Sequence, residues 1–148
     1  MEQRAILIVD DDEIIRETLR GVLESKGYVI DTAETAKEAM EKSKARTFSL
    51  ALLDIKLPDM EGTELLKKMH GLAPGMMKVM ITAHGTLKNA MDSLNFGADA
   101  YLLKPINSKE LLKTVEEKLA EQHVAETMSE EKVAEWILTR LQKLEKVQ

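Results

Sequence analysis

Carboxylate, hydroxyl and ammonium side chains follow four of the short apolar runs in this sequence. Asp10 and Asp11 follow one run, Asp54 another, and Thr82 and Lys104 two more. Clustered carboxylates repel each other unless a cation joins them, and their hard oxygen atoms favour Mg²⁺ or the similar Mn²⁺. An aspartate beside such an ion can attack a phosphoryl group and form an acyl phosphate. A lysine ammonium and a threonine hydroxyl suit the remaining phosphoryl oxygens, so the pattern indicates phosphoryl chemistry on Asp54.

These residues meet only if the apolar runs are neighbouring parallel strands. The runs cover residues 5–9, 28–33, 50–53, 76–81 and 100–103. Most are continuously apolar, which is typical of strands buried on both faces. Apolar residues between them recur every three or four positions, which predicts helices. This alternation predicts an α/β protein with a doubly wound five-stranded parallel sheet, whose ligands bind at the carboxyl ends of the strands.

Local signals predict where several of these helices begin and end. Gly27 and Gly97 stand where a C-terminal cap belongs. Thr35 and Asn107 each precede a glutamate by three residues, which is the pattern of a helix N-terminus. Asp12 is placed to cap the first helix, since anionic residues favour that end.

A tail follows the strand–helix alternation from about residue 121. We expect residues 1–120 to form one domain and residues 121–148 a C-terminal helical extension. Ser129, followed by Glu130 and Glu131, predicts the start of a separate helix. Its apolar residues recur at spacings of four, four and three: Val133, Ile137, Leu141 and Leu144. This stripe can pack back on the domain or pair with another copy, and we expect a homodimer.

Composition excludes several other classes of protein. The 148 residues carry a net charge of −5, the opposite of the basic footprint of a generic nucleic-acid-binding protein. No apolar run is long enough for a membrane span or for a signal peptide, so we expect no membrane contact and a cytoplasmic location. The chain has no cysteine, which excludes disulfides and thiolate chemistry.

Four fragments in this order resemble the receiver domains of bacterial and archaeal response regulators. They are Val9-Asp10-Asp11, the segment from Asp54 to Gly62, Thr82-Ala83 and Lys104-Pro105. The resemblance covers about residues 4 to 120. It implies a flavodoxin-like sheet in the strand order 2-1-3-4-5, five helices, and a cis peptide bond at Lys104–Pro105.

The same resemblance implies a role for each strand-end residue. Asp54 would accept a phosphoryl group from a sensor histidine kinase or a phosphotransfer protein. Asp10, Asp11, Asp54 and the backbone carbonyl of Lys56 would hold Mg²⁺ or Mn²⁺. Thr82 would move toward the phosphoryl group, and Lys104 would pair with it. The chain would then be a weak catalyst acting only on itself.

Three further positions carry a switch or a timing role in this family. Tyr101 would be the aromatic switch residue on the fifth strand, acting with Thr82. The Lys56 side chain and His84 would tune the lifetime of the acyl phosphate. The readout surface would be the fourth helix, fifth strand and fifth helix, facing a downstream protein that the sequence does not name.

Other interpretations of these residues stay open at this point. Thr82 could be an N-cap, Lys104 a surface lysine and Tyr101 plain sheet packing. A magnesium-dependent phosphohydrolase would use an aspartate pair two residues apart, as Asp10 and Asp12 are. A third hypothesis is a receiver-like interaction module, and the chain could also be part of a longer transcriptional regulator. A tail of about 28 residues is too short for a DNA-binding domain, so we expect no direct contact with nucleic acid.

Overall fold

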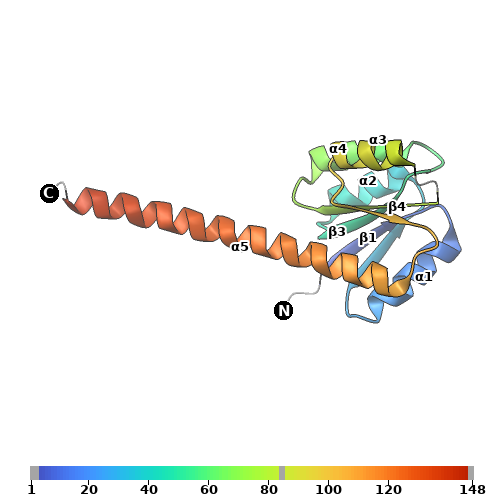
Figure 1. Ribbon diagram of the computed structural model, residues 1–148, viewed down its shortest axis with the longest axis horizontal. Helices are drawn as coiled ribbons and strands as arrows, with labels where there is room; N and C mark the ends of the chain where they lie inside the picture. The colour runs from blue at the N-terminus through green and yellow to red at the C-terminus, as the bar shows by residue number, and fades with distance from the viewer. Residues whose placement is uncertain (1–3, 84–85, 147–148) are drawn as a thin grey trace.

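Five parallel strands form the centre of the computed structural model, which describes residues 4–83 and 86–146 (Figure 1). The strands are β1 (Ala5–Val9), β2 (Val29–Ala33), β3 (Leu50–Asp54), β4 (Met77–Thr82) and β5 (Ala100–Leu103). Their order in the sheet is β2-β1-β3-β4-β5, and every neighbouring pair is parallel. The predicted sheet is confirmed, and each predicted strand boundary lies within one residue of the observed one.

Five helices connect and follow the strands. They are α1 (Glu13–Glu24), α2 (Ala36–Ala45), α3 (Gly62–Leu72), α4 (Leu87–Asn95) and α5 (Ser108–Lys146). The predicted caps are confirmed. Asp12, Thr35 and Asn107 accept backbone hydrogen bonds at the starts of α1, α2 and α5. Gly27 and Gly97 have φ angles of 89° and 102°, a region that favours glycine.

Apolar side chains cover both faces of the sheet, in two clusters. Leu7 and Val9 of β1 lie in the cluster that contains buried residues of α2 and α3. Ile6 and Ile8, on the opposite face, lie in the cluster that contains buried residues of α1 and α5. Figure 1 shows this three-layer arrangement, with α2, α3 and α4 on one side of the sheet and α1 and α5 on the other. Each fully buried leucine or isoleucine contributes about 1.5–3 kcal/mol to stability.

The prediction of a separate helix from Ser129 is wrong, because α5 runs without a break for 39 residues. No glycine or proline occurs between Ser108 and Lys146, so no helix-breaking residue divides this segment into two helices at Ser129. Gln122 is buried, but the described side chains beyond it are exposed, apart from the partly covered Thr127. The helix projects away from the sheet (Figure 1), so the structure does not have the back-packed arrangement. No helix among the described residues is both long and apolar enough to cross a membrane.

Candidate functional site

The register of the sheet brings the predicted chemical residues to one edge. Val9 of β1 pairs with Leu53 of β3, so Asp10 and Asp54 come next on adjacent strands. Asp54 in turn pairs with Ile81, which places Thr82 one residue beyond it on β4. Thr82 pairs with Leu103, and Lys104 follows at the end of β5. The strand ends therefore hold the whole set within one region of the molecule.

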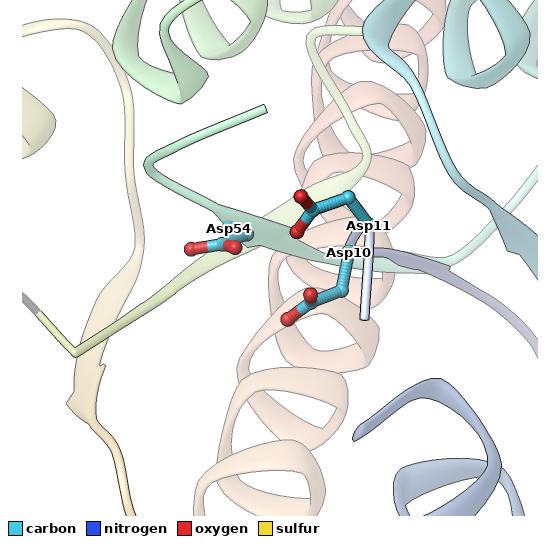
Figure 2. Close-up of side chains that lie close together, drawn as sticks. All are labelled: Asp10, Asp11 and Asp54. Carbon is cyan, nitrogen blue, oxygen red and sulfur yellow. The ribbon is translucent and has the colours of Figure 1, made fainter. Parts of the chain in front are cut away.

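Three carboxylates gather at this edge. Asp10, Asp11 and Asp54 each offer one oxygen, and these oxygens all lie within 4.8 Å of one another. Figure 2 shows the side chains converging from the ends of β1 and β3. Asp10 and Asp54 are buried, whereas Asp11 is exposed. An oxygen-only set with one side open to solvent fits a hard divalent cation such as Mg²⁺, which keeps several of its waters.

Lys104 joins two of these carboxylates. Its Nζ lies 2.8 Å from Oδ2 of Asp10 and 3.4 Å from Oδ2 of Asp54. Burial alone would lower the pKa of Lys104, but the hydrogen bond and charge of Asp10, together with Asp54, outweigh burial and raise it. Lys104 is therefore a permanent positive charge at this site. Its backbone N–H also donates to the carbonyl of Thr82 at 2.8 Å, and the Lys104–Pro105 bond is cis, as the resemblance implies.

Asp54 lies in an environment that opposes its negative charge. Burial, and then the nearby charge of Asp10, raise the pKa of Asp54. Lys104 and a backbone hydrogen bond from the N–H of Lys56 act in the opposite direction, but they do not cancel the increase. The N–H of Lys56 is 3.4 Å from Oδ1 of Asp54, so this contact is weak. A cation at this edge would reduce the electrostatic repulsion between the carboxylates.

The structure describes three of the four other predicted residues, and the roles of all four stay predictions. Thr82 is buried within β4 and does not cap α4, which begins at Leu87. Tyr101 is partly buried on β5, and its buried hydroxyl has no hydrogen-bond partner among the described residues. The side chain of Lys56 is exposed. His84 lies outside the described residues.

Asp12 does not form a reactive pair with Asp10. Its Oδ1 accepts hydrogen bonds from the backbone N–H groups of Ile14 at 2.9 Å and Ile15 at 3.3 Å. The Asp12 backbone N–H also donates to Oδ1 of Asp10 at 2.9 Å. The Asp12 carboxylate is thus a helix cap, and the aspartate pair expected of a phosphohydrolase is not assembled here.

Gly62 is a residue of the site whose role the sequence did not reveal. A Cβ atom at this position would lie 2.0 Å from the carbonyl oxygen of Asp54 and 2.6 Å from Cα of Ile55. Only glycine therefore allows the start of α3 to approach the backbone of Asp54. Gly62 belongs to the fragment that begins at Asp54, but nothing in the spacing signals this contact.

One local and one long-range set of contacts fix the loops around the carboxylates. Arg16 is buried in α1, and its Nη1 donates to the carbonyl of Asp10 at 2.7 Å. Asp59, in the loop after Asp54, accepts hydrogen bonds from the first two N–H groups of α2, both at 2.9 Å. Sequence patterns do not reveal the Asp59 contacts because their partners lie more than twenty residues earlier. They do not reveal the Arg16 contact because it depends on how α1 packs against the end of β1.

Comparison with known proteins agrees with this geometry. The model of the response regulator receiver domain family matches residues 6–116. The chain belongs to this family. Its fold is shared with a solved CheY-like receiver domain from Methanospirillum hungatei, which is 51% identical. That match covers 84% of this chain and 99% of the other, with a TM-score of 0.82.

The curated relatives of this receiver domain are longer proteins. It is 36% identical over 117 residues to the alginate biosynthesis transcriptional regulatory protein AlgB of Pseudomonas putida. It is 33% identical over 115 residues to the transcriptional regulatory protein ZraR of Escherichia coli. The matches cover 79% and 78% of this chain but only 26% of each relative. The chain therefore spans about a quarter of the length of these two proteins.

Proposed function

We propose that this receiver accepts a phosphoryl group on Asp54, in a magnesium-dependent reaction, from a sensor histidine kinase or a phosphotransfer protein. The observation that carries this proposal is the joint position of Asp10, Asp11, Asp54 and Lys104 at one sheet edge. The first three offer oxygen ligands, and the fourth offers a fixed positive charge beside the nucleophile. We further propose that residues 1–120 form the receiver unit and residues 121–148 an extension with a separate role.

The transfer is a displacement at phosphorus. A carboxylate oxygen of Asp54 forms the new O–P bond while the bond from phosphorus to the donor histidine nitrogen breaks, and its electron pair returns to the imidazole. Bound Mg²⁺ would supply neutralisation of the phosphoryl oxygens. Asp10, Asp11 and the carbonyl of Lys56 would hold it. Lys104 already contacts Oδ2 of Asp54, so a small movement lets it pair with a phosphoryl oxygen while keeping its bond to Asp10.

Phosphorylation would reach a protein surface through β4 and β5. We infer that Thr82 moves toward the new phosphoryl group and that Tyr101 responds on the neighbouring strand. The buried hydroxyl of Tyr101 supports this, because it has no hydrogen-bond partner among the described residues and such a group gains by finding a partner in a second conformation. Met91 and Leu94 on α4 and Leu103 on β5 are exposed and apolar, which supports a protein partner at this face.

The proposal extends to location, downstream target and the lifetime of the acyl phosphate. We propose a cytoplasmic location, since the phosphodonors of receiver domains act there. We propose a protein as the downstream target, because the net charge of −5 disfavours direct contact with nucleic acid. We propose that the side chain of Lys56, which is exposed, hinders or orients the water that hydrolyses the acyl phosphate.

Intact-mass measurement tests the proposal. Wild-type protein is incubated with Mg²⁺ and a small phosphodonor, and we expect a phosphate-mass adduct that disappears when the metal is chelated. Asp54→Asn should give no adduct. Asp12→Asn is the matched control, because Asp12 lies at the same edge but caps a helix, a role that asparagine also fills. An equal adduct in Asp54→Asn, or none in wild type, would overturn the proposal.

A further inference from the structure

The distal half of α5 presents an apolar stripe that none of the described residues covers. Val133, Ile137, Leu138, Leu141 and Leu144 are exposed to between 46% and 64%. A single helix in water is marginally stable, and an amphipathic helix normally gains its stability by burying its apolar face. We infer that a second copy of this chain covers the stripe, as a parallel, in-register two-stranded coiled coil. This inference is independent of phosphoryl transfer.

Three residues of this stripe, together with Ala134, follow a heptad pattern, and Val133 and Leu138 flank it. Ala134, Ile137, Leu141 and Leu144 are spaced by three, four and three residues, which are the a, d, a and d positions of a heptad. This spacing keeps one seam of the helix facing a partner. The seam begins after Glu130, which occupies the preceding d position, so the paired segment lies well away from the sheet.

A hollow on the surface of α5 has the arrangement of a hole for a partner side chain. A shallow and almost wholly apolar hollow is lined by Glu130, Val133, Ala134 and Ile137. These residues are spaced i, i+3, i+4 and i+7 on one face of the helix. In a coiled coil, each knob inserts into a hole made by four residues of the facing helix, and this is such a set. The knob that reaches it in a parallel pair is Ala134 of the second copy.

Flanking charges select the parallel orientation. In a parallel pair, each g position lies beside the e position five residues later on the partner. This places Arg140 beside Glu145 of the second copy, and Val133 beside Leu138 of the second copy. Both contacts are favourable, one by charge and the other by apolar burial.

The antiparallel alternative brings like charges together. The antiparallel alignment that matches all four apolar layers pairs g with g and e with e. It sets Arg140 against Arg140 of the second copy, and Glu131 against Glu145 of the second copy. Like charges at such flanking positions are destabilising, so the same stripe disfavours this arrangement. The parallel pair places both receiver bodies at the same end of the coil.

Disulfide trapping tests both the partner and the orientation, because the chain has no cysteine of its own. The full chain is prepared as Ile137→Cys, Leu144→Cys and Thr139→Cys, and each variant is oxidised mildly under native conditions. Ile137 and Leu144 are seam positions, whereas Thr139 lies on the outer face of the pair. We expect covalent dimers of the first two variants and none of the third.

Each outcome of this trapping decides something. In a parallel, in-register pair, every seam residue lies opposite the same residue of the second copy. In an antiparallel pair, identical residues lie opposite each other at only one height along the helix. Two cysteine positions a full heptad apart can therefore both form disulfides only in the parallel pair. Trapping at only one seam position would therefore overturn the orientation. Trapping at neither, or equally at Thr139, would overturn the coiled coil and favour a different partner for the stripe.

Charge reversal gives an independent measurement by sedimentation equilibrium. Arg140→Glu and Glu145→Arg each break two symmetry-related contacts, so we expect each to raise the dimer dissociation constant between about twofold and thirtyfold. The double variant restores opposite charges and should return to within about threefold of wild type. A double variant as weak as either single variant would overturn the parallel register.

Discussion

Replacement of Gly62 by alanine tests the close approach that positions Asp54. The added methyl carbon would lie 2.0 Å from the carbonyl oxygen of Asp54 and 2.6 Å from Cα of Ile55. An ordinary contact needs about 3.5 Å, so the carbonyl oxygen must move away by about 1.5 Å and the Cα atom by about 0.9 Å. The obstructing atoms belong to the backbone of β3 and the residue after it. They cannot rotate away as a side chain would.

The cost of this substitution follows from that rigidity. Overpacking costs about 1–3 kcal/mol where side chains can adjust, and occasionally more. Because backbone must move here, we expect a loss of at least about 3 kcal/mol. For a chain of this size, each kcal/mol lowers the melting temperature by about 2–4 °C. Gly62→Ala should therefore melt at least about 6–12 °C below wild type, and phosphoryl transfer to the displaced Asp54 should slow.

Gly71→Ala is the matched control in the same helix. A Cβ atom at Gly71 meets nothing within 4 Å, and alanine is favoured over glycine in a helix by about 0.5–1 kcal/mol. This variant should melt slightly above wild type and accept phosphate normally. Circular dichroism on heating gives both melting temperatures. If Gly62→Ala melts as high as Gly71→Ala, the account of how Asp54 is positioned is wrong.

Three further perturbations test the electrostatics of the site. Burial and the charge of Asp10 raise the pKa of Asp54, so the folded protein keeps a proton that the unfolded chain releases, and stability falls as pH rises from the usual to the raised pKa. Asp54→Asn removes this fall, and in metal-free buffer at neutral pH we expect it to melt above wild type; a lower melting temperature would contradict this. Lys104→Met leaves two buried carboxylates unpaired, so urea unfolding without metal should show a loss of about 3–5 kcal/mol, and a smaller loss with Mg²⁺; equal losses in both buffers would argue against a cation site. Backbone hydrogen bonds lower the pKa of Asp59, so its contribution is present above the usual pKa and is lost as pH falls through the lowered one. In Asp59→Ala, the melting temperature should therefore fall less steeply than in wild type as pH drops below about 4. An unchanged pH profile would show that Asp59 makes no such contribution.

The sequence predicts the sheet and the edge of the site because both depend on local patterns. Each apolar run ends where polar chemistry begins, as with Val9 before Asp10 and Leu53 before Asp54. Parallel strands bring those ends together, so their order along the chain suffices to place the residues. This logic locates Thr82 without any knowledge of its contacts.

Other parts of the site depend on contacts that a linear pattern does not contain. Arg16 has the spacing of an ordinary polar helix residue, yet it is buried and holds the carbonyl of Asp10. Asp59 caps a helix that begins before it in the chain. Both contacts exist only once the elements are packed.

The tail shows the opposite case, in which a local pattern predicts a helix boundary that the fold does not have. Ser129 followed by Glu130 and Glu131 has the composition of a helix start. A capping residue stabilises a helix only at its first residue, and Ser129 lies in the middle of α5, which begins at Ser108. The apolar stripe beyond it is exposed in the structure, and the predicted homodimer contact stays a prediction.

Identification of the phosphorylated residue is the most direct test of the central claim. The protein is treated with Mg²⁺ and a phosphodonor, then reduced with borohydride, which converts an aspartyl phosphate to homoserine. Peptide mass spectrometry then reads the modified position. We expect homoserine at residue 54 alone, and only when Mg²⁺ is present. Homoserine at Asp10, Asp11 or Asp12 would place the nucleophile on β1 and favour the hydrolase hypothesis, and no homoserine at any position would contradict the receiver's phosphoryl chemistry.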